Sequence, residues 1–508
     1  MFEAAEVGNI VSKEEYKTRA PRLRTDLLEV QRELSRQARF PVIVVFGGVD
    51  GGGKSETVHL LNEWMDPRWI VTRAFDDPSE EERSRPDYWR YWQALPPRGR
   101  MGLFLRSWYS PPLMERVYRH LKTAEFDERL NRIAAFEKGL ADDGALILKF
   151  WMHLGRRAQK KRLKKLERDP RTRWRVSKVQ WKHWRMYDDF VAAAERAIER
   201  TSTADAPWTI VEGDDERYRT LAVATIIRDA MGRRVGEASR ASRRSSDRSR
   251  KSIAPRATVV PMGSASSRIV LSQLDMSRAI DRSVFRQKLE ERQGRLNLLQ
   301  RKARERGISA ILVFEGWDAA GKGGAIRRVA AALDSAAYQI IPIAAPTDEE
   351  RAHHYLWRFW RHLPRRGMLS IFDRSWYGRV LVERVEGFAS PAEWFRAYSE
   401  INDFEEQLVE HGYVLVKYWL HITADEQLRR FKERERLAFK QWKLTEEDWR
   451  NRKQSSEYAR AVNEMVARTS TRTAPWTLVE ANDKYYARIK VIDAFCARLE
   501  KALKSRRT

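Results

Sequence analysis

Two segments of the sequence carry the glycines and the lysine of a phosphate-binding loop. Gly48 to Ser55 and Gly316 to Gly323 both follow the pattern Gly-x4-Gly-Lys directly after an apolar run. Small residues let backbone N–H groups close around phosphate oxygens, and a helix that follows adds positive potential at its N-terminus. Lys54 and Lys322 would reach the terminal phosphates. The spacing therefore predicts two sites for a phosphate chain.

Two carboxylates beside the second loop are typical of a magnesium site. Asp318 lies inside the loop, and Asp373 ends the apolar run 370–372. Charge on a transferring phosphoryl group must be neutralised, and a hydroxyl after the loop lysine usually helps to hold the metal. Gly323 stands at that place and cannot be a ligand. We therefore expect Asp318 and Asp373 to bind Mg²⁺ between them.

The two loops belong to a tandem duplication. They lie 268 residues apart, and the same offset aligns residues 106–109 (Arg-Ser-Trp-Tyr) with residues 374–377, without a gap. Leu105, however, stands where the second copy has Asp373. Leucine can neither coordinate magnesium nor orient its waters. We therefore expect the first copy to be inactive or severely impaired. It would keep the fold, and could still bind a phosphate chain or act as a packing partner.

Arginines near the second carboxylate pair are candidate phosphate ligands. Arg374 follows Asp373 directly, and Arg379 lies where it could project toward the same cleft. Guanidinium groups bind phosphate oxygens in pairs, with strong and directional hydrogen bonds. At three places the first copy lacks a cation of the second: it has Pro111, Leu166 and Glu216 opposite Arg379, Arg434 and Lys484.

The elements that would position these residues alternate between strands and helices. Short, continuously apolar runs occur at residues 41–46, 145–150 and 208–211, and again at 310–314, 413–418 and 476–479. Such runs are typical of strands buried on both faces of a parallel sheet. Residues 391–410 have a helical period. Each copy is therefore predicted to be an α/β domain, with a parallel sheet flanked by helices.

Basic segments mark the lids and the boundary between the copies. Residues 156–190 and 424–458 are charged helical stretches at matching places, and we interpret them as lids over the phosphates; a solvated helix face is the alternative. Residues 236–263 are rich in Ser and Arg and poor in large apolar residues, so we predict a flexible basic linker there. The predicted domains are residues 1–235 and 264–508.

The composition indicates which classes of partner and which compartment to expect. The chain has 508 residues and a net charge of +26, which indicates an anionic partner such as nucleic acid, a membrane surface or a polyanionic substrate. Cys496 is the only cysteine, so no intrachain disulfide can form. The sequence shows neither a signal peptide nor an apolar run of about 18 residues. We therefore expect a cytoplasmic protein without a membrane partner; a homo-oligomer remains open.

Three motifs of the second copy together resemble the polyphosphate kinase 2 family. They are Gly-x-Asp-x-x-Gly-Lys-Gly-Gly at 316–324, Phe-Asp-Arg-Ser-Trp-Tyr at 372–377 and Thr-x-x-Ala-Pro-Trp at 471–476. The resemblance covers nearly all of both copies, and the tandem arrangement is similar to the fused class II members, the polyphosphate:AMP phosphotransferases. It implies a thymidylate-kinase-like P-loop fold, inorganic polyphosphate as donor, AMP as acceptor with ADP as product, and a need for Mg²⁺.

The resemblance also implies roles for individual residues. Asp318 and Asp373 would be the metal and catalytic carboxylates, Lys322 and Arg374 would act on the phosphates, and Arg434 would be a lid cation. The residues expected to bind the phosphates from the loop are Gly316, Ala319, Ala320, Gly321, Gly323 and Gly324.

Two other functions stay open at this point. The acceptor could be ADP or another nucleoside diphosphate, which the sequence does not separate from AMP. A nucleotide- or nucleic-acid-binding P-loop protein is the alternative from a different class. It would leave the two carboxylates without a role, and the sequence contains no recognised nucleic-acid module. We therefore expect polyphosphate, AMP and ADP as partners, and no nucleic acid.

Overall fold

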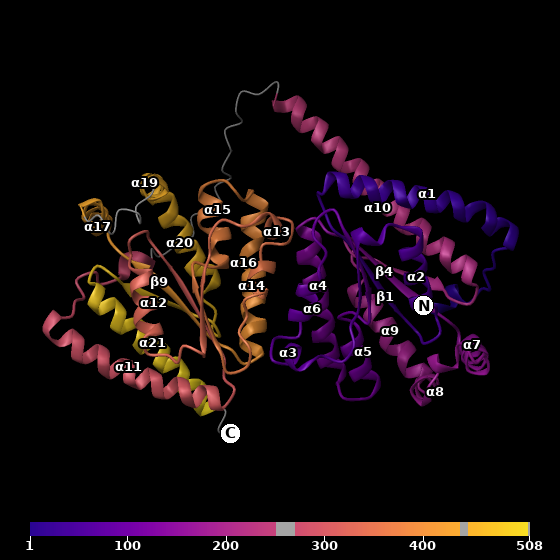
Figure 1. Ribbon diagram of the computed structural model, residues 1–508, viewed down its shortest axis with the longest axis horizontal. Helices are drawn as coiled ribbons and strands as arrows, with labels where there is room; N and C mark the ends of the chain where they lie inside the picture. The colour runs from indigo at the N-terminus through magenta and orange to yellow at the C-terminus, as the bar shows by residue number, and fades with distance from the viewer. Residues whose placement is uncertain (250–269, 437–445, 506–508) are drawn as a thin grey trace. The chain divides into compact units, whose positions relative to one another are not determined.

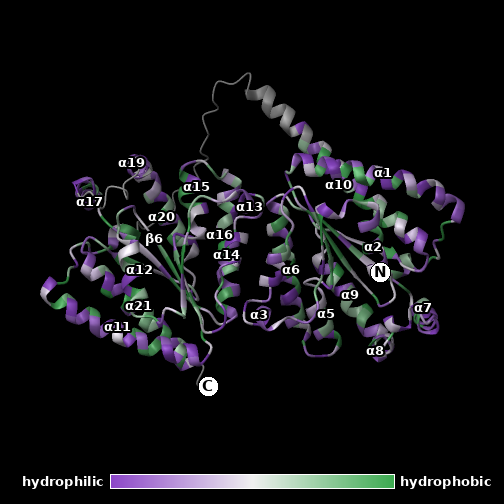
Figure 2. Cartoon of the chain, in the orientation of Figure 1, coloured by the Kyte–Doolittle hydropathy of each residue, from purple (hydrophilic) through white to green (hydrophobic). Residues whose placement is uncertain are grey.

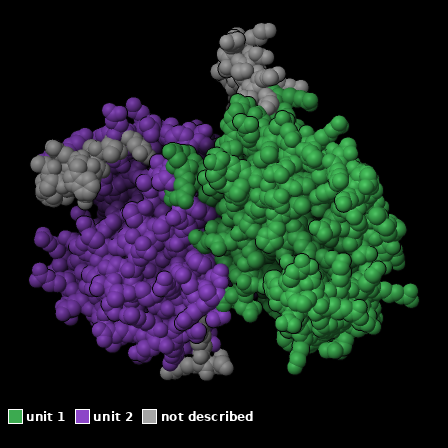
Figure 3. Space-filling view, turned by 45° about the vertical axis from the view of Figure 1, so that its right-hand side comes forward, with its two compact units in different colours: residues 1–78, 90–257, 348–354 green, residues 79–89, 258–347, 355–508 purple. Residues whose placement is uncertain are grey.

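The computed structural model describes residues 1–249, 270–436 and 446–505, and Figure 1 shows its helices and strands. The chain divides into two compact units, coloured separately in Figure 3. One comprises residues 1–78, 90–257 and 348–354, and the other residues 79–89, 258–347 and 355–508. Each unit therefore contains most of one repeat and a short segment of the other.

Each repeat has one five-stranded sheet, and all neighbouring strands are parallel. The first sheet has the order β2-β3-β1-β4-β5 and the second the equivalent order β7-β8-β6-β9-β10. The strands are β1 (Val42–Gly48), β2 (Ile70–Ala74), β3 (Met101–Leu105), β4 (Leu146–His153), β5 (Trp208–Glu212), β6 (Ala310–Gly316), β7 (Tyr338–Pro342), β8 (Leu369–Asp373), β9 (Val414–His421) and β10 (Trp476–Glu480).

Helices follow the strands in both repeats, as a parallel sheet requires. In the first repeat they are α1 (Lys13–Gln37), α2 (Lys54–Trp64), α3 (Glu80–Arg83), α4 (Trp89–Ala94), α5 (Ser110–Val117), α6 (Thr123–Asp142), α7 (Arg156–Arg168), α8 (Lys178–Arg185), α9 (Tyr187–Thr201) and α10 (Glu216–Ser249). In the second they are α11 (Arg282–Glu305), α12 (Lys322–Ala330), α13 (Asp348–Arg351), α14 (Trp357–Trp360), α15 (Val382–Val385), α16 (Pro391–Glu410), α17 (Ala424–Arg436), α19 (Glu446–Lys453), α20 (Ser455–Thr469) and α21 (Lys484–Ser505). The predicted α/β class with two parallel sheets is confirmed.

The central strands β1, β4, β6 and β9 are buried on both faces, as their continuous apolar runs predict, whereas the edge strands β2 and β7 are largely exposed. In β1, Val42, Val44 and Phe46 pack with apolar residues of α1, α2 and α10, while Ile43 and Val45 point to the opposite face and are equally buried. The equivalent core of the second repeat joins β6 to α11, α12 and α21. Figure 2 shows hydrophobic colour concentrated in the strands between the helical layers.

The predicted helix at 391–410 is confirmed as α16. Pro391 occupies its first turn, where the missing N–H costs nothing. Ser390 precedes it, and its backbone N–H donates to the carboxylate of Glu393 at 2.8 Å in a capping box. No helix among the described residues is long and apolar enough to cross a membrane.

Parts of the predicted linker and lid fall outside the described residues. α10 continues to Ser249, so the first half of the predicted linker 236–263 is helical, and the remainder lies beyond the described ranges. The first lid, residues 156–190, contains α7, η3 (Arg173–Arg175) and α8. The second lid, residues 424–458, contains α17 and α19, and residues 437–445 between them are not described.

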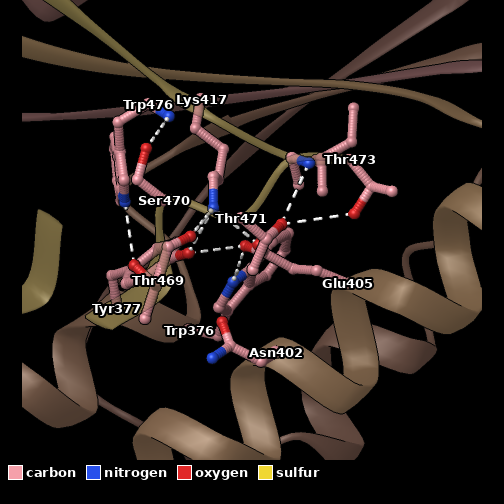
Figure 4. A network of polar contacts seen from close by, with 12 residues as sticks. Trp376, Tyr377, Asn402, Glu405, Lys417, Thr469, Ser470, Thr471, Thr473 and Trp476 are labelled. Atoms are coloured by element: carbon pink, nitrogen blue, oxygen red, sulfur yellow. Dashed lines mark hydrogen bonds and ion pairs between the residues drawn. The ribbon is translucent and has the colours of Figure 1, made fainter. Parts of the chain in front are cut away.

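A buried polar network holds the segment that follows β8. Lys417 Nζ on β9 donates to Glu405 Oε2 at 2.6 Å, to Tyr377 Oη at 2.9 Å and to the carbonyl of Thr469 at 2.7 Å (Figure 4). Trp376 Nε1 donates to the second oxygen of Glu405 at 3.0 Å. Both charged side chains are at most 1% exposed. The network therefore ties β9, α16 and α20 to the residues directly after Asp373 and Arg374.

The first repeat contains the same network at the same offset. Lys149 Nζ donates to Glu137 at 2.7 Å, to Tyr109 at 2.9 Å and to the carbonyl of Thr201 at 2.7 Å. Burial lowers the pKa of Lys149 and raises that of Glu137, and each charge opposes the shift of the other. Since the first repeat lacks Asp373, its copy of the network serves packing, and the pair supports the fold in both repeats.

Replacement of Lys417 should destabilise the second repeat. Lys417→Met leaves Glu405 without its counter-charge in a site closed to water. Removing one partner of a buried ion pair lowers the free energy of unfolding by about 3–5 kcal/mol. Hydrogen exchange of the β9 amides, followed by mass spectrometry, should accelerate accordingly. The matched variant Lys149→Met should accelerate exchange in β4 and leave β9 unchanged. Unaltered exchange of β9 in Lys417→Met would contradict the role of the pair.

Candidate functional site

The second loop closes between β6 and α12 because two glycines allow its backbone path. Gly316 has φ +150°, and a Cβ built there would lie 2.5 Å from the carbonyl oxygen of Leu420 on β9. Gly321 has φ +105° and caps α12. Only glycine adopts these positive φ angles without strain, and only glycine allows the close approach of Leu420 at position 316. Ala319 between them also lies in the left-handed region, at φ +63°. The loop therefore presents the N-terminus of α12 to the pocket beside it.

Lys322 lies at the start of α12 and reaches back over the loop. Its Nζ donates to the carbonyl oxygens of Gly316 at 2.7 Å and Trp317 at 3.3 Å. Lys54 of the first repeat makes the equivalent bonds, to Gly48 at 2.7 Å and to the residue after it at 2.8 Å. The ammonium group is thus held at the loop in both repeats, where a terminal phosphate would be bound.

The register of two strands brings the predicted carboxylates to one pocket. Phe314 of β6 is paired with Asp373 of β8, so the loop after β6 lies beside the end of β8. Arg374 has φ +66°, and its backbone N–H donates to the carbonyl of Phe314 at 3.0 Å. Its guanidinium donates to Asp318 Oδ1 at 3.3 Å. Such a strained residue at a cleft is typical of functional sites.

A pocket of about 500 Å³ lies against this loop. Seven of its lining residues are Lys or Arg and four are Asp or Glu, so its wall is positive and suits a polyanion. The charged residues are Asp318, Lys322, Arg327, Asp373, Arg374, Arg430, Glu433, Arg434, Asp448, Lys484 and Arg488. The predicted residues Ala319, Ala320, Gly321, Gly323 and Gly324 also line it.

A smaller pocket of about 70 Å³ also adjoins the loop. Gly316 and Trp317 line it, together with Asp318 and Arg374, which belong to both pockets. Asn451 of the second lid also lines it, and its Nδ2 donates to Asp318 Oδ2 at 2.9 Å. Asp318 and Arg374 therefore stand between the two spaces, where a group bound in either pocket would meet them.

Arg430 is a site residue that the sequence interpretation did not single out. It is 8% exposed, and its guanidinium donates to the loop carbonyls of Ala319 at 2.9 Å and Ala320 at 3.1 Å. It also donates to the carbonyls of Ala481 at 2.7 Å and Asn482 at 2.9 Å, which follow β10. Arg430 therefore ties the second lid to the loop. Its match with Arg162 at the repeat offset was the available signal.

Arg327, Lys484 and Arg488 also line the larger pocket, and no motif spacing in the sequence predicts their place there. Arg327 is on α12, whereas Lys484 and Arg488 are on α21. Lys484 was singled out only through the charge difference with Glu216, and nothing in the local sequence marks the other two. They join the site because α12 and α21 pack together in one core.

The model of the polyphosphate kinase 2 family matches residues 10–238 and, a second time, residues 279–507. The chain belongs to this family. A curated relative from Pseudomonas aeruginosa, named polyphosphate:AMP phosphotransferase, is 51% identical over 99% of both chains. Another of that name, from Pseudomonas syringae, is 49% identical over 99% of both chains. A crystal structure of a polyphosphate kinase 2 from Pseudomonas aeruginosa is similar with a TM-score of 0.88 and 49% identity, over 99% of both chains.

The two repeats of this polyphosphate kinase 2 chain differ at the end of one strand. Leu105 pairs with Phe46 in the register that Asp373 has with Phe314, so the leucine replaces a pocket carboxylate directly. Asp50, the equivalent of Asp318, accepts a hydrogen bond from His183 at 2.7 Å. Burial alone raises the pKa of Asp50, but the hydrogen bond from His183 and nearby cations bring it below 3.8. The first repeat thus has one carboxylate where the second has two.

Arg379 is the one predicted phosphate ligand that lines neither pocket described above. Arg379 lies in the 3-10 helix η5, Trp376–Val380. Its guanidinium pairs with Glu383 at 3.2 Å and lies 4.6 Å from the ring centre of Tyr355. The Arg379 side chain is only 15% exposed, so it is packed against these neighbours and largely shielded from solvent.

The two arginines can be separated by their effect on phosphate binding. Arg430→Lys removes the planar fork that holds the loop carbonyls, so affinity for inorganic tripolyphosphate should fall about tenfold, or about 1.4 kcal/mol. Calorimetric titration measures it. Arg379→Lys is the matched variant, and from its position we expect little change. A larger loss for Arg379→Lys than for Arg430→Lys would instead support Arg379 as a phosphate ligand.

Proposed function

We propose that the chain transfers a phosphoryl group from inorganic polyphosphate to AMP, forming ADP, and that the second repeat catalyses the reaction. The observation that carries this proposal is the pocket of the second repeat, in which seven cations and four carboxylates, Asp318 and Asp373 among them, adjoin a phosphate-binding loop. Two curated relatives that match over 99% of their own length and of this chain carry the name of this activity. Their similarity extends over both repeats.

The charge of the pocket suits a long phosphate chain. Every unit of polyphosphate is negatively charged, so a cationic surface binds it through the salt-dependent release of counterions that also operates with nucleic acids. The net charge of +26 belongs to the whole chain, but Arg327, Lys484 and Arg488 place part of it beside the loop. We infer that the donor enters along these cations and ends at Lys322.

The residues of the loop act by position and charge. Phosphoryl transfer asks for little covalent chemistry from a protein, and most of its catalysis is alignment and electrostatic stabilisation. An oxygen of the AMP phosphate bonds to the terminal phosphorus as the bond to the chain breaks, and the chain leaves one unit shorter. Backbone N–H groups of residues 319–324 and the Lys322 ammonium bind phosphate oxygens. Arg374 and Arg434 neutralise the charge that develops during transfer.

Asp318 and Asp373 are the residues that would hold Mg²⁺. Both line the larger pocket, and Mg²⁺ commonly takes one or two carboxylates together with substrate phosphates and several waters. Within the described residues, no group of three or more His, Cys, Asp or Glu side chains could hold a metal ion. The carboxylate oxygens of Asp318 and Asp373, which line the same pocket, are donors of the kind that Mg²⁺ prefers and fit the ion. When bound, the ion would neutralise negative charge on the transferring phosphoryl group.

Chromatography of the nucleotides tests the proposed reaction. The purified full chain, incubated with Mg²⁺, polyphosphate and AMP, should produce ADP, and removal of Mg²⁺ with EDTA should abolish the product. A parallel incubation with ADP measures the alternative acceptor. ATP formed from ADP, without ADP formed from AMP, would contradict the assignment of AMP and retain the family. No product from either nucleotide would contradict phosphoryl transfer itself.

The loop lysines test which repeat is catalytic. Lys322→Ala removes an ammonium group that binds phosphate, so turnover should fall by about 10²–10³-fold, the scale of losing one electrostatic stabiliser. Lys54→Ala is the matched variant at the same position of the first loop, and its turnover should remain within a few-fold of the unaltered chain. Steady-state rates of ADP formation measure both. Equal losses would contradict catalysis by the second repeat alone.

A further inference from the structure

Glu56 of the first repeat stands where the second repeat has Gly324. Gly324 lines the phosphate pocket, and a Cβ built there would lie 3.4 Å from Arg488, another lining residue. A side chain at this place therefore enters the space beside the loop. Glu56 lies in the first turn of α2, so it brings a carboxylate to the helix N-terminus that closes the first loop.

Three arginines bind the carboxylate of Glu56. Arg162 Nη2 lies 2.9 Å and 3.0 Å from its two oxygens, Arg175 Nη1 lies 3.2 Å from Oε1, and Arg219 Nη2 lies 3.2 Å from Oε2. Arg162 and Arg175 come from the first lid, and Arg219 comes from α10. Several guanidinium groups around one group of anionic oxygens are the arrangement with which proteins bind phosphate.

The arginine cluster lies directly against the first loop. A Cβ at Gly53, the last residue of the loop, would be 2.3 Å from Arg219 Cζ, and a Cβ at Gly51 would be 3.2 Å from Arg162 Cγ. Arg162 is the equivalent of Arg430, which holds the second loop and lines its pocket. Arg219 is only 1% exposed. The cluster therefore occupies the side of the loop where the second repeat has its phosphate pocket.

Arg219 depends on Glu56 for its counter-charge. Burial lowers the pKa of Arg219, and the carboxylate of Glu56 is the first of the charges that oppose this shift. The remaining partner of its guanidinium in this region is the carbonyl of Gly213, at 2.7 Å. Removing the carboxylate would leave a buried cation without its hydrogen-bonded counter-charge, because Glu216 and Asp215 oppose the shift less than Glu56 does, and an anion from solution could replace it.

We propose that the first repeat contains a second site for a phosphate chain, and that the Glu56 carboxylate occupies it in place of a phosphate group. The carboxylate also joins the first lid to the loop, because two of its three arginines belong to that lid. Once vacated, the site would bind inorganic phosphate chains without transferring a phosphoryl group, since Leu105 leaves it without the second carboxylate. This inference concerns the first repeat and does not depend on catalysis by the second.

Hydrogen exchange of the full chain tests this site. The variant Glu56→Gly reproduces the residue of the second repeat, and inorganic tripolyphosphate is the probe. Without the probe, the amides of residues 156–175 should exchange at least tenfold faster in Glu56→Gly than in the unaltered chain. Tripolyphosphate should restore most of the protection, whereas NaCl at equal ionic strength should not. In the unaltered chain the probe should leave the exchange of these amides unchanged.

Two substitutions separate the charge of Glu56 from its size. Glu56→Gln keeps the side chain in the site and removes its charge, so exchange should accelerate but tripolyphosphate should restore less protection than in Glu56→Gly. In the second repeat, Gly324→Glu should weaken tripolyphosphate binding more than Gly324→Gln, because only the glutamate supplies a competing carboxylate. This second pair decides the matter if Glu56→Gly fails to fold.

Three outcomes would overturn the proposal. If NaCl protected residues 156–175 of Glu56→Gly from exchange as strongly as tripolyphosphate does, the arginine cluster would have no preference for a phosphate chain. Protection of residues 156–175 by tripolyphosphate in the unaltered chain would mean that Glu56 does not fill the site. Equal effects of Gly324→Glu and Gly324→Gln on calorimetric binding would remove the competing role of the carboxylate.

Discussion

The pairing of β6 with β8 is the constraint on which the site depends. Parallel neighbours end at the same edge of a sheet, so the loop after β6 and the residues after β8 must lie side by side. The bond from the Arg374 backbone to Phe314 extends that pairing by one residue. A register shifted by one residue would turn Asp373 to the other face. The buried pair of Lys417 and Glu405 then holds the next residues, so the position of the carboxylate rests on the core.

The two repeats share the same sheet and buried network but differ in the side chains around the loop. The sheets have equivalent strand orders, and the buried Lys–Glu network occurs in both. Packing requires these features whatever the site does. The polar residues at the sheet edge are under no such requirement, since a leucine or a glutamate there leaves the core intact. Leu105 and Glu56 therefore change the charge beside the first loop and leave its path unchanged.

Arginine has two distinct uses around the loops. Arg430 and Arg162 lie at equivalent positions. Arg430 donates to carbonyls of the loop and pairs with Glu426 on its own helix, whereas Arg162 pairs with Glu56 beside the loop. In the second repeat the guanidinium thus shapes the loop and leaves the adjoining pocket positive. In the first repeat an internal anion neutralises the cluster. Glutamate in place of glycine at the start of the helix contributes to this difference in charge, together with Leu166 and Glu216 in place of Arg434 and Lys484.

Local patterns in the sequence determined the loops, the apolar strands, α16 and the duplication, because each depends on residues that are close together along the chain. The edge strands β2 and β7 carry no such apolar run and were not predicted. Gly316, Lys322 and Asp373 could be identified in this way, and so could the loss marked by Leu105. The pocket was decided only by the tertiary structure. Arg488 reaches it through the packing of α21, whereas η5 turns Arg379 into a contact with Glu383. Neither position follows from spacing, since both depend on how distant helices pack.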